Sequence, residues 1–209
     1  MGGFIMKKYF DNIYNKSYDT LFNKICRNLD NKKRTFIVTA NPNTLMCTEN
    51  DTVMSDILLD KNILATFFMD GSVVENNMAV VLELSSNGNQ IENLGYDGKY
   101  SLERFGWTNN MISSLTNKDT KFCYTDYKNS EILELCSDYK MYTVKPTISV
   151  NNYPFTTVKK ELESGSIISF NLNETTLKEL PSIITYIKQK GYNIVTLNQL
   201  ISEKLVEEK

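Results

Sequence analysis

The sequence lacks histidine entirely, and it has one tryptophan and four cysteines among 209 residues. Without histidine, a zinc site of the usual Cys/His type and the Ser/His/Asp and Cys/His catalytic groups are excluded. A Cys/Lys or Ser/Lys nucleophile stays open, although no motif indicates one. None of the cysteines belongs to a C-x-x-C pair, so reduced thiols in or near the core are favoured over a disulfide framework. The four are Cys26, Cys47, Cys123 and Cys136.

Long apolar runs and charge of one sign are also missing. No run approaches the roughly 20 apolar residues that a membrane span needs. The first residues become charged at Lys7 before a signal-peptide apolar stretch can form. The sequence as given therefore favours the cytoplasm, or an extracytoplasmic place if an export signal has been removed. Because 23 basic residues balance 25 acidic ones, we expect no nucleic acid or anionic membrane as partner.

Hydrophobic periodicity divides the chain into an N-terminal helical extension, residues 1–34, and a main domain, residues 35–209. Residues 7–30 carry apolar side chains at helical spacing, which predicts one amphipathic helix. We expect this helix to pack on the main domain, with self-association as the alternative. From residue 35 on, short apolar strands alternate with helices, which favours a parallel sheet, either open or closed into a barrel. The predicted strands are 35–40, 63–69, 89–93, 121–125, 140–144, 147–150, 165–171 and 192–197, and the predicted helices are 50–60, 73–85, 103–116, 129–138, 154–163, 173–191 and one from about 198.

Three segments resemble one known family. They are "ATFFMDGSVVENN" (65–77), "GNQIENLGYDG" (88–98) and "GSIISFNLNETTLKELPSIITYIKQKGYNIVTLNQLI" (165–201). In order and spacing they are similar to the polysaccharide deacetylase family (carbohydrate esterase family 4, the NodB homology domain), over about residues 35–202. The resemblance implies an α/β fold, a distorted (β/α) barrel of about seven parallel strands, with the N-terminal helix outside it.

The resemblance also implies where the chemistry would be. Family enzymes bind a divalent metal through one Asp and two His, and they use a second Asp as base and a late His as acid. In this sequence every such position is changed, which implies a degenerate member with no catalytic residue, no metal and no cofactor. The base falls on Asn41, the metal ligands on Pro42, Leu94 and Gly98, a motif arginine on Cys123 or Tyr124, a further Asp on Lys145, and the acid on Asn171.

Aspartates near predicted strand ends are oxygen donors that could hold a hard cation in place of the lost site. Such residues are more often helix caps or solvated loop charges, and we favour that interpretation. The five are Asp51, Asp56, Asp70, Asp97 and Asp126.

Amide, carboxylate and aromatic side chains gather at the predicted mouth of the barrel, in a set that suits a glycan. The alternative is that Asn and Tyr are simply common in this chain. The candidate ligand-binding residues are Asn41, Asn43, Asn93, Tyr96, Asp97, Trp107, Tyr124, Asp126, Tyr127 and Asn171.

These observations predict a pseudoenzyme that binds a glycan, or a protein partner through the N-terminal helix, in cell-envelope or sporulation biology. We favour a partly filled old centre, with Leu94 and Pro42 closing it by apolar atoms. The alternative function is an active polysaccharide or peptidoglycan deacetylase or hydrolase with an unrecognised site. A shorter stretch, "FIVTANPNTLM" (36–46), is similar to a motif of the bacterial glycosyltransferases for teichoic acid and acetylmannosamine, and it ranks far lower.

Overall fold

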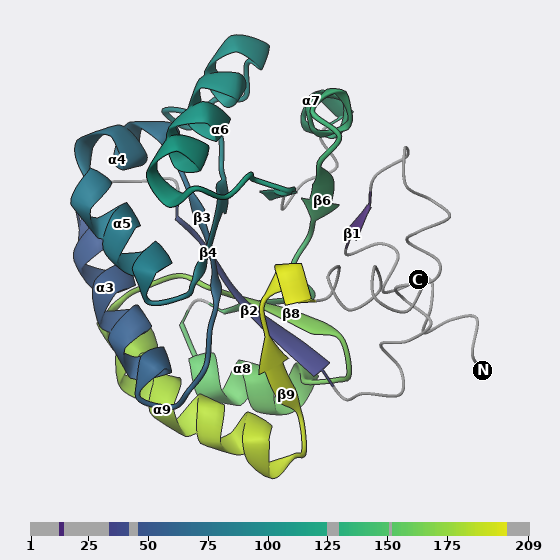
Figure 1. Ribbon diagram of the computed structural model, residues 1–209. Coiled ribbons are helices and arrows are strands. Elements are labelled where there is room, and N and C mark those ends of the chain that lie inside the picture. The colour runs from purple at the N-terminus through teal and green to yellow at the C-terminus, as the bar shows by residue number, and fades with distance from the viewer. Residues whose placement is uncertain (1–12, 15–33, 42–45, 125–129, 151, 200–209) are drawn as a thin grey trace, which may run out of the picture.

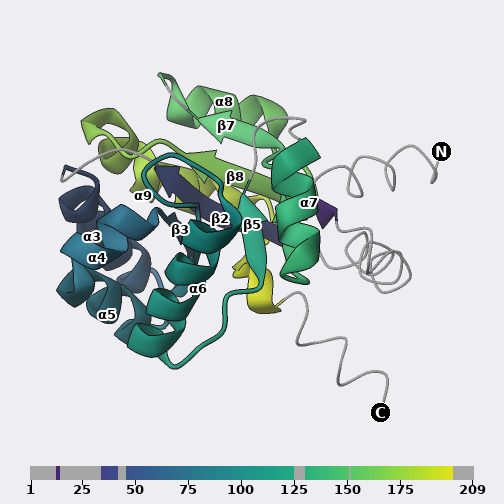
Figure 2. The ribbon, with the colours of Figure 1, turned by 90° about the horizontal axis from the view of Figure 1, so that it is seen from above.

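The computed structural model describes residues 13–14, 34–41, 46–124, 130–150 and 152–199. Within them one sheet forms the centre, and helices surround it (Figures 1 and 2). The strands are β1 (Ile13–Tyr14), β2 (Arg34–Asn41), β3 (Thr66–Met69), β4 (Gln90–Asn93), β5 (Phe122–Tyr124), β6 (Tyr142–Val144), β7 (Ile148–Val150), β8 (Ser166–Phe170) and β9 (Asn193–Val195).

The described strands are ordered β1-β6-β5-β4-β3-β2-β8-β7, and β9 also pairs with β2. Every pairing among β2 to β9 is parallel, and β1 alone runs antiparallel, beside β6. β2 is long enough for β9 and β3 to share one of its edges, since Thr35 is opposite Ile194 and Val38 is opposite Thr66. The predicted fold, a distorted α/β barrel of parallel strands, is confirmed.

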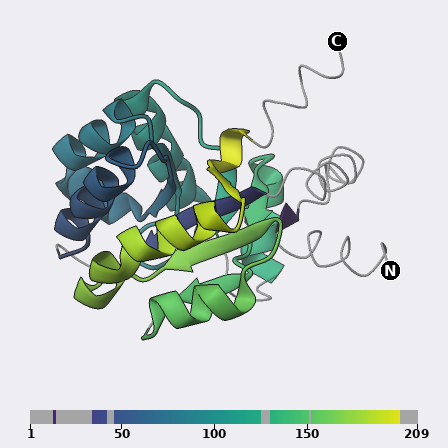
Figure 3. The same cartoon turned by 90° about the horizontal axis from the view of Figure 1, so that it is seen from below.

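The helices follow the predicted segments closely. Asn173 caps the last long helix by accepting a hydrogen bond from the Thr176 N–H, 2.9 Å away, so the predicted start of that helix is confirmed. The predicted helix 73–85 is divided at Asn77, whose backbone is not helical. Figure 3 shows α8 and α9 side by side below the sheet. The helices are α3 (Met46–Leu59), α4 (Gly71–Asn76), α5 (Met78–Ser86), α6 (Leu102–Thr116), α7 (Ser130–Asp138), α8 (Pro154–Glu161) and α9 (Glu174–Gln189).

Strand side chains alternate between a helix-covered outer face and the inside of the barrel. The main apolar core lies on the outer face, where Phe67, Met69, Ile168 and Phe170 pack with helix residues such as Leu180. The intervening side chains therefore point inward. These are Thr66 and Phe68 on β3, Gln90 and Glu92 on β4, Phe122 and Tyr124 on β5, and Ile167 and Ser169 on β8.

Two sequence expectations need correction. Within the predicted helix 7–30, Ile13 and Tyr14 form β1 on the edge of β6, since a β-branched and an aromatic residue suit a sheet edge. The rest of that segment lies outside the described residues. The expectation of reduced thiols is wrong for Cys123 and Cys136, which form a disulfide with Cα atoms 6.2 Å apart. Among the described helices, none has the length and apolar character that a membrane crossing needs.

Candidate functional site

The residues predicted to occupy the family's catalytic positions lie, where the structure describes them, at the carboxyl ends of parallel strands. Asn41 ends β2, Leu94 follows β4, Lys145 follows β6 and Asn171 follows β8. Because parallel barrels bring these ends to one face, the fold still gathers the positions where the family site would be. Four predicted residues lie outside the described part of the chain: Pro42, Asn43, Asp126 and Tyr127.

The two histidine positions of the family belong to one short loop after β4. Leu94 is only 5% exposed, and its backbone N–H donates to the Met69 carbonyl at 3.0 Å. Gly98 is exposed and has a φ of +67°, and a Cβ placed there would meet no atom within 4 Å. Neither residue has a side-chain donor atom, so these two positions do not fit the divalent metal that the family fold implies.

A buried carboxylate, Asp70, organises this loop. It follows β3, is completely buried, and caps α4 by accepting hydrogen bonds from the Ser72 backbone N–H (2.9 Å) and hydroxyl (2.7 Å). It also accepts the backbone N–H groups of Asp97 and Gly98, both at 2.9 Å. The interpretation of this aspartate as a helix cap is therefore confirmed, and its second pair of hydrogen bonds fixes the loop of the former histidines.

Inside the barrel, Tyr124 reaches from β5 to β8. Its hydroxyl lies 3.0 Å from that of Ser169, and its ring lies 5.3 Å from the Phe68 ring, at 54°. Three strands, β4, β3 and β2, separate β5 from β8 along the sheet. The contact therefore runs across the barrel interior, and it places aromatic atoms beneath the carboxyl ends of the strands.

Two predicted glycan contacts already have partners within the protein. Asn93 is buried against α6, where its amide donates to the Phe105 carbonyl (2.9 Å) and to the Asn109 side chain (2.7 Å). The Tyr96 hydroxyl donates to Glu75 at 2.6 Å, and this hydrogen bond raises the Tyr96 pKa. The Arg104 guanidinium lies over the same ring, 4.8 Å from its centre.

The remaining described candidates do not converge on one point. Asp97 and Asn171 are exposed, and the Asn171 carbonyl accepts the Thr176 hydroxyl at 2.8 Å. Trp107 is 53% exposed on α6 and lines an outer groove together with Met78, instead of facing the barrel interior. Lys145 is exposed as well, and Cys123 is held in the disulfide on the helix-covered face.

Sequence reasoning missed the buried carboxylate of Glu92. It accepts the amide of Gln90 (2.5 Å) and the backbone N–H groups of Lys121 (2.7 Å) and Phe122 (2.8 Å). The backbone pairing of β4 with β5 is short, with Asn93 opposite Cys123. The Glu92 carboxylate therefore joins the two strands beyond this pair, where the strands are not paired through their backbones. Burial raises the Glu92 pKa to about 7, although these hydrogen bonds oppose the shift. The sequence signal that could have revealed this buried carboxylate is the acidic residue in the predicted buried strand "NQIEN".

No cluster of three or more His, Cys, Asp or Glu side chains able to hold a metal occurs among the described residues. Comparison with known proteins identifies the scaffold. The profile of the polysaccharide deacetylase family matches residues 28–163. The chain belongs to the polysaccharide deacetylase family.

Relatives share this scaffold at low identity. The uncharacterized protein YlxY of Bacillus subtilis (strain 168) is 25% identical in an alignment of 168 positions, which covers 72% of this chain and 52% of that protein. The chain thus spans about half the length of this curated relative. Among solved structures, the carbohydrate esterase family 4 pseudoenzyme BA3943 of Bacillus anthracis has a TM-score of 0.74 and 21% identity, over 82% of this chain and 66% of that one. The peptidoglycan deacetylase PdaC of Bacillus subtilis has a TM-score of 0.71 and 21% identity, over 86% and 95%.

Proposed function

We propose that this protein is a non-catalytic polysaccharide deacetylase homologue that acts by binding. The observation that carries the proposal is the loop after β4, because the resemblance to the family puts both metal-binding histidines at Leu94 and Gly98, which have no side-chain ligand atom. The chain has no histidine that could substitute for them. Metal-assisted deacetylation needs a Lewis acid and an activated water, and the loss of ligands, base and acid together removes the basis of both.

The relatives support the idea that this fold persists without its reaction. BA3943 is described as a family pseudoenzyme, and a mutant of it as having restored enzymatic activity. In the present chain, burial of Leu94 stabilises the fold by roughly 1 to 2 kcal/mol, whereas an unpaired charge at that depth would be costly. An apolar residue at a former ligand position therefore favours a centre kept for stability.

A protein partner is favoured over a glycan in the old centre. Tyr124 is bound to Ser169 across the barrel, and Asn93 and Tyr96 are engaged by neighbouring side chains. These groups are therefore less available to sugar hydroxyls. A role in cell-envelope or sporulation biology is consistent with what relatives such as peptidoglycan deacetylases act on. Glycan binding at the mouth remains the second candidate, because three of its ten predicted residues, Asn43, Asp126 and Tyr127, lie outside the described part of the chain.

The proposal is tested by metal analysis and by acetate release from chitin and peptidoglycan oligomers. We expect no stoichiometric zinc, cobalt or nickel after dialysis, and no acetate above the buffer blank, with PdaC as the positive control. Acetate release that a chelator abolishes would show that an active site was overlooked. Oligomer binding at millimolar or lower concentration without hydrolysis would instead support the glycan-binding form of the proposal.

A further inference from the structure

Exposed large apolar side chains gather on one side of the molecule. Apart from Tyr153, all those in the described residues lie on α3, α5 and α6, and each is between 45 and 60% exposed. Figures 1 and 2 show these helices as neighbours around one side of the sheet, with α5 in contact with both α3 and α6. Such a concentration is typical of a surface that another molecule covers. The residues are Val53, Leu59, Met78, Leu82, Leu102 and Trp107.

A groove of about 390 Å³ lies between α5 and α6 within this surface. Trp107, Met111 and Leu115 line it at four-residue intervals along α6, and Met78 at the start of α5 forms the opposite wall. Tryptophan and methionine are enriched in protein interfaces, because one supplies a large rigid surface and the other adapts its shape. A groove of this kind between two helices suits the apolar stripe of a third helix.

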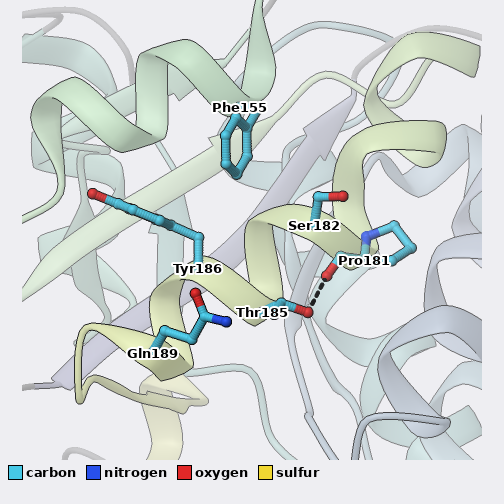
Figure 4. Close-up of a pocket in the computed structure, with 6 residues that line it drawn as sticks. All are labelled: Phe155, Pro181, Ser182, Thr185, Tyr186 and Gln189. Atoms are coloured by element: carbon cyan, nitrogen blue, oxygen red, sulfur yellow. Dashed lines mark hydrogen bonds between the residues drawn. The ribbon is translucent and has the colours of Figure 1, made fainter.

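The groove between α8 and α9 is of a different kind (Figure 4). Its aromatic rings, Phe155 and Tyr186, pack against each other with centroids 5.7 Å apart. The Thr185 hydroxyl is bonded to the Pro181 carbonyl at 2.9 Å, and the Tyr186 hydroxyl donates to the Lys159 carbonyl. Because its aromatic rings and the Thr185 and Tyr186 hydroxyls already have partners inside the protein, this second groove offers less to a ligand.

Charge distinguishes the partners that the α5–α6 groove would accept. On α4, α5 and α6 the exposed charged residues are Glu75, Glu83, Glu103 and Arg104, three acidic and one basic. These helices therefore carry net negative charge, and a partner with Lys or Arg beside its apolar stripe would be electrostatically complementary.

We propose that the α5–α6 groove, formed by Met78, Trp107, Met111 and Leu115, is the docking site for a basic amphipathic helix of a partner protein. This inference rests on the proposed binding function, and it names the surface and the chemistry of the partner. The apolar stripe of the helix enters the groove, and its cationic residues face the net negative charge of α4 to α6.

Trp107 is the single tryptophan of the chain, so its fluorescence reports directly on this groove. The probe is a synthetic Leu/Lys peptide of about 18 residues, five helical turns, with Leu at helical spacing. We expect a blue shift of Trp107 emission and reduced acrylamide quenching on titration. A twin peptide with Glu in place of every Lys should bind at least about tenfold more weakly at low salt, because like charges face each other.

Matched variants locate the effect. Met78→Ser and Met111→Ser, one on each wall, should weaken peptide binding at least about tenfold, a difference of roughly 1.4 kcal/mol. Val53→Ser on α3 is the control, since Val53 is 45% exposed but lies outside the groove. Circular dichroism spectra that match the parent protein would show that the variants are folded.

Other outcomes overturn the proposal. Equal binding of the Glu peptide would mean non-specific apolar adhesion. A blue shift that grows with protein concentration alone would mean that a second copy occupies the groove, and a shift with chitin oligomers would mean a glycan site. If the Lys peptide does not bind, and no metal and no acetate release are found, the docking proposal fails and the non-catalytic assignment stands. Chelator-sensitive acetate release would overturn that assignment, whatever the peptide does.

Discussion

The hydroxyl groups of Tyr124 and Ser169 lie 3.0 Å apart, joining β5 to β8 through the interior of the barrel. In the family pattern the region of Tyr124 carries an arginine of the catalytic site. Here the side chain is nearly buried and its ring packs against Phe68. A residue at or next to the predicted arginine position is thus part of the packing that holds opposite strands together.

Tyr124→Phe should lower the free energy of unfolding by about 1 kcal/mol, because it removes a buried hydrogen bond and leaves the Ser169 hydroxyl without this partner. Tyr124→Ala should cost about 3 to 5 kcal/mol, since it also leaves a cavity. Urea unfolding measures both. Tyr153→Phe is the control, because Tyr153 is 75% exposed. Equal, negligible effects for Tyr124→Phe and Tyr153→Phe would show that the contact contributes no stability.

Asp70→Ala should loosen the loop that carries the former histidine positions. The substitution removes the acceptor for the Asp97 and Gly98 backbone N–H groups and for the α4 cap. We expect much faster hydrogen exchange at those two amides and a stability loss of about 2 to 3 kcal/mol. Asp56→Ala, at an exposed position of α3, is the control. Unchanged exchange at both amides in a folded Asp70→Ala protein would refute the anchoring role.

Two buried carboxyl groups should make stability depend on pH. Burial raises the pKa of Asp51 from 3.8 to about 7 and that of Glu92 from 4.5 to about 7. At pH values between the ordinary pKa of each group and about 7, the folded state keeps a proton that the unfolded state has released. Their contribution to stability is therefore full below about pH 4 and is lost as the pH rises to about 7, by at most roughly 4 kcal/mol for Asp51 and roughly 3 kcal/mol for Glu92.

Asp51→Asn tests this dependence most cleanly, because the Asp51 Oδ1 is buried without a hydrogen-bond partner. The variant should gain stability relative to the parent at pH 8 and lose that advantage at pH 4. Chemical unfolding at several pH values gives the difference, and Asp56→Asn on the same helix serves as the control. A difference between variant and parent that stays constant from pH 4 to pH 8 would contradict the raised pKa.

Reduction of the Cys123–Cys136 disulfide should destabilise the segment that it closes. The two residues are 13 positions apart, and closing a loop of about this size constrains the unfolded chain by about 3 kcal/mol. Thermal unfolding with and without a reductant measures the effect, and Cys136→Ser should reproduce it without reductant. Titration of four free thiols in the denatured, unreduced protein would show that the bond is absent.

The sequence predicted the fold well because strand and helix periods alternate cleanly, and because three segments resemble one family in the same order and spacing. It predicted the site less well, for physical reasons. The side-chain partners of Asn93 and Tyr96 come from α6 and α4, which pattern reasoning cannot place. The Cys123–Cys136 disulfide depends on β5 and α7 lying close together in space, which the separation of the two cysteines along the sequence does not reveal.

We predict that the metal site of the family can be rebuilt in this chain. Gly98 has open space for a side chain, and although its positive φ costs a histidine roughly 1 to 2 kcal/mol, Asp70 already holds the loop in place. We expect the combined variant Asn41→Asp, Pro42→Asp, Leu94→His and Gly98→His to bind about one equivalent of zinc. The same variant without Gly98→His should bind zinc far more weakly. Calorimetry and metal analysis after dialysis measure both, and a folded four-substitution protein that binds no zinc would show that the ends of β2 and β4 do not converge as the family site requires.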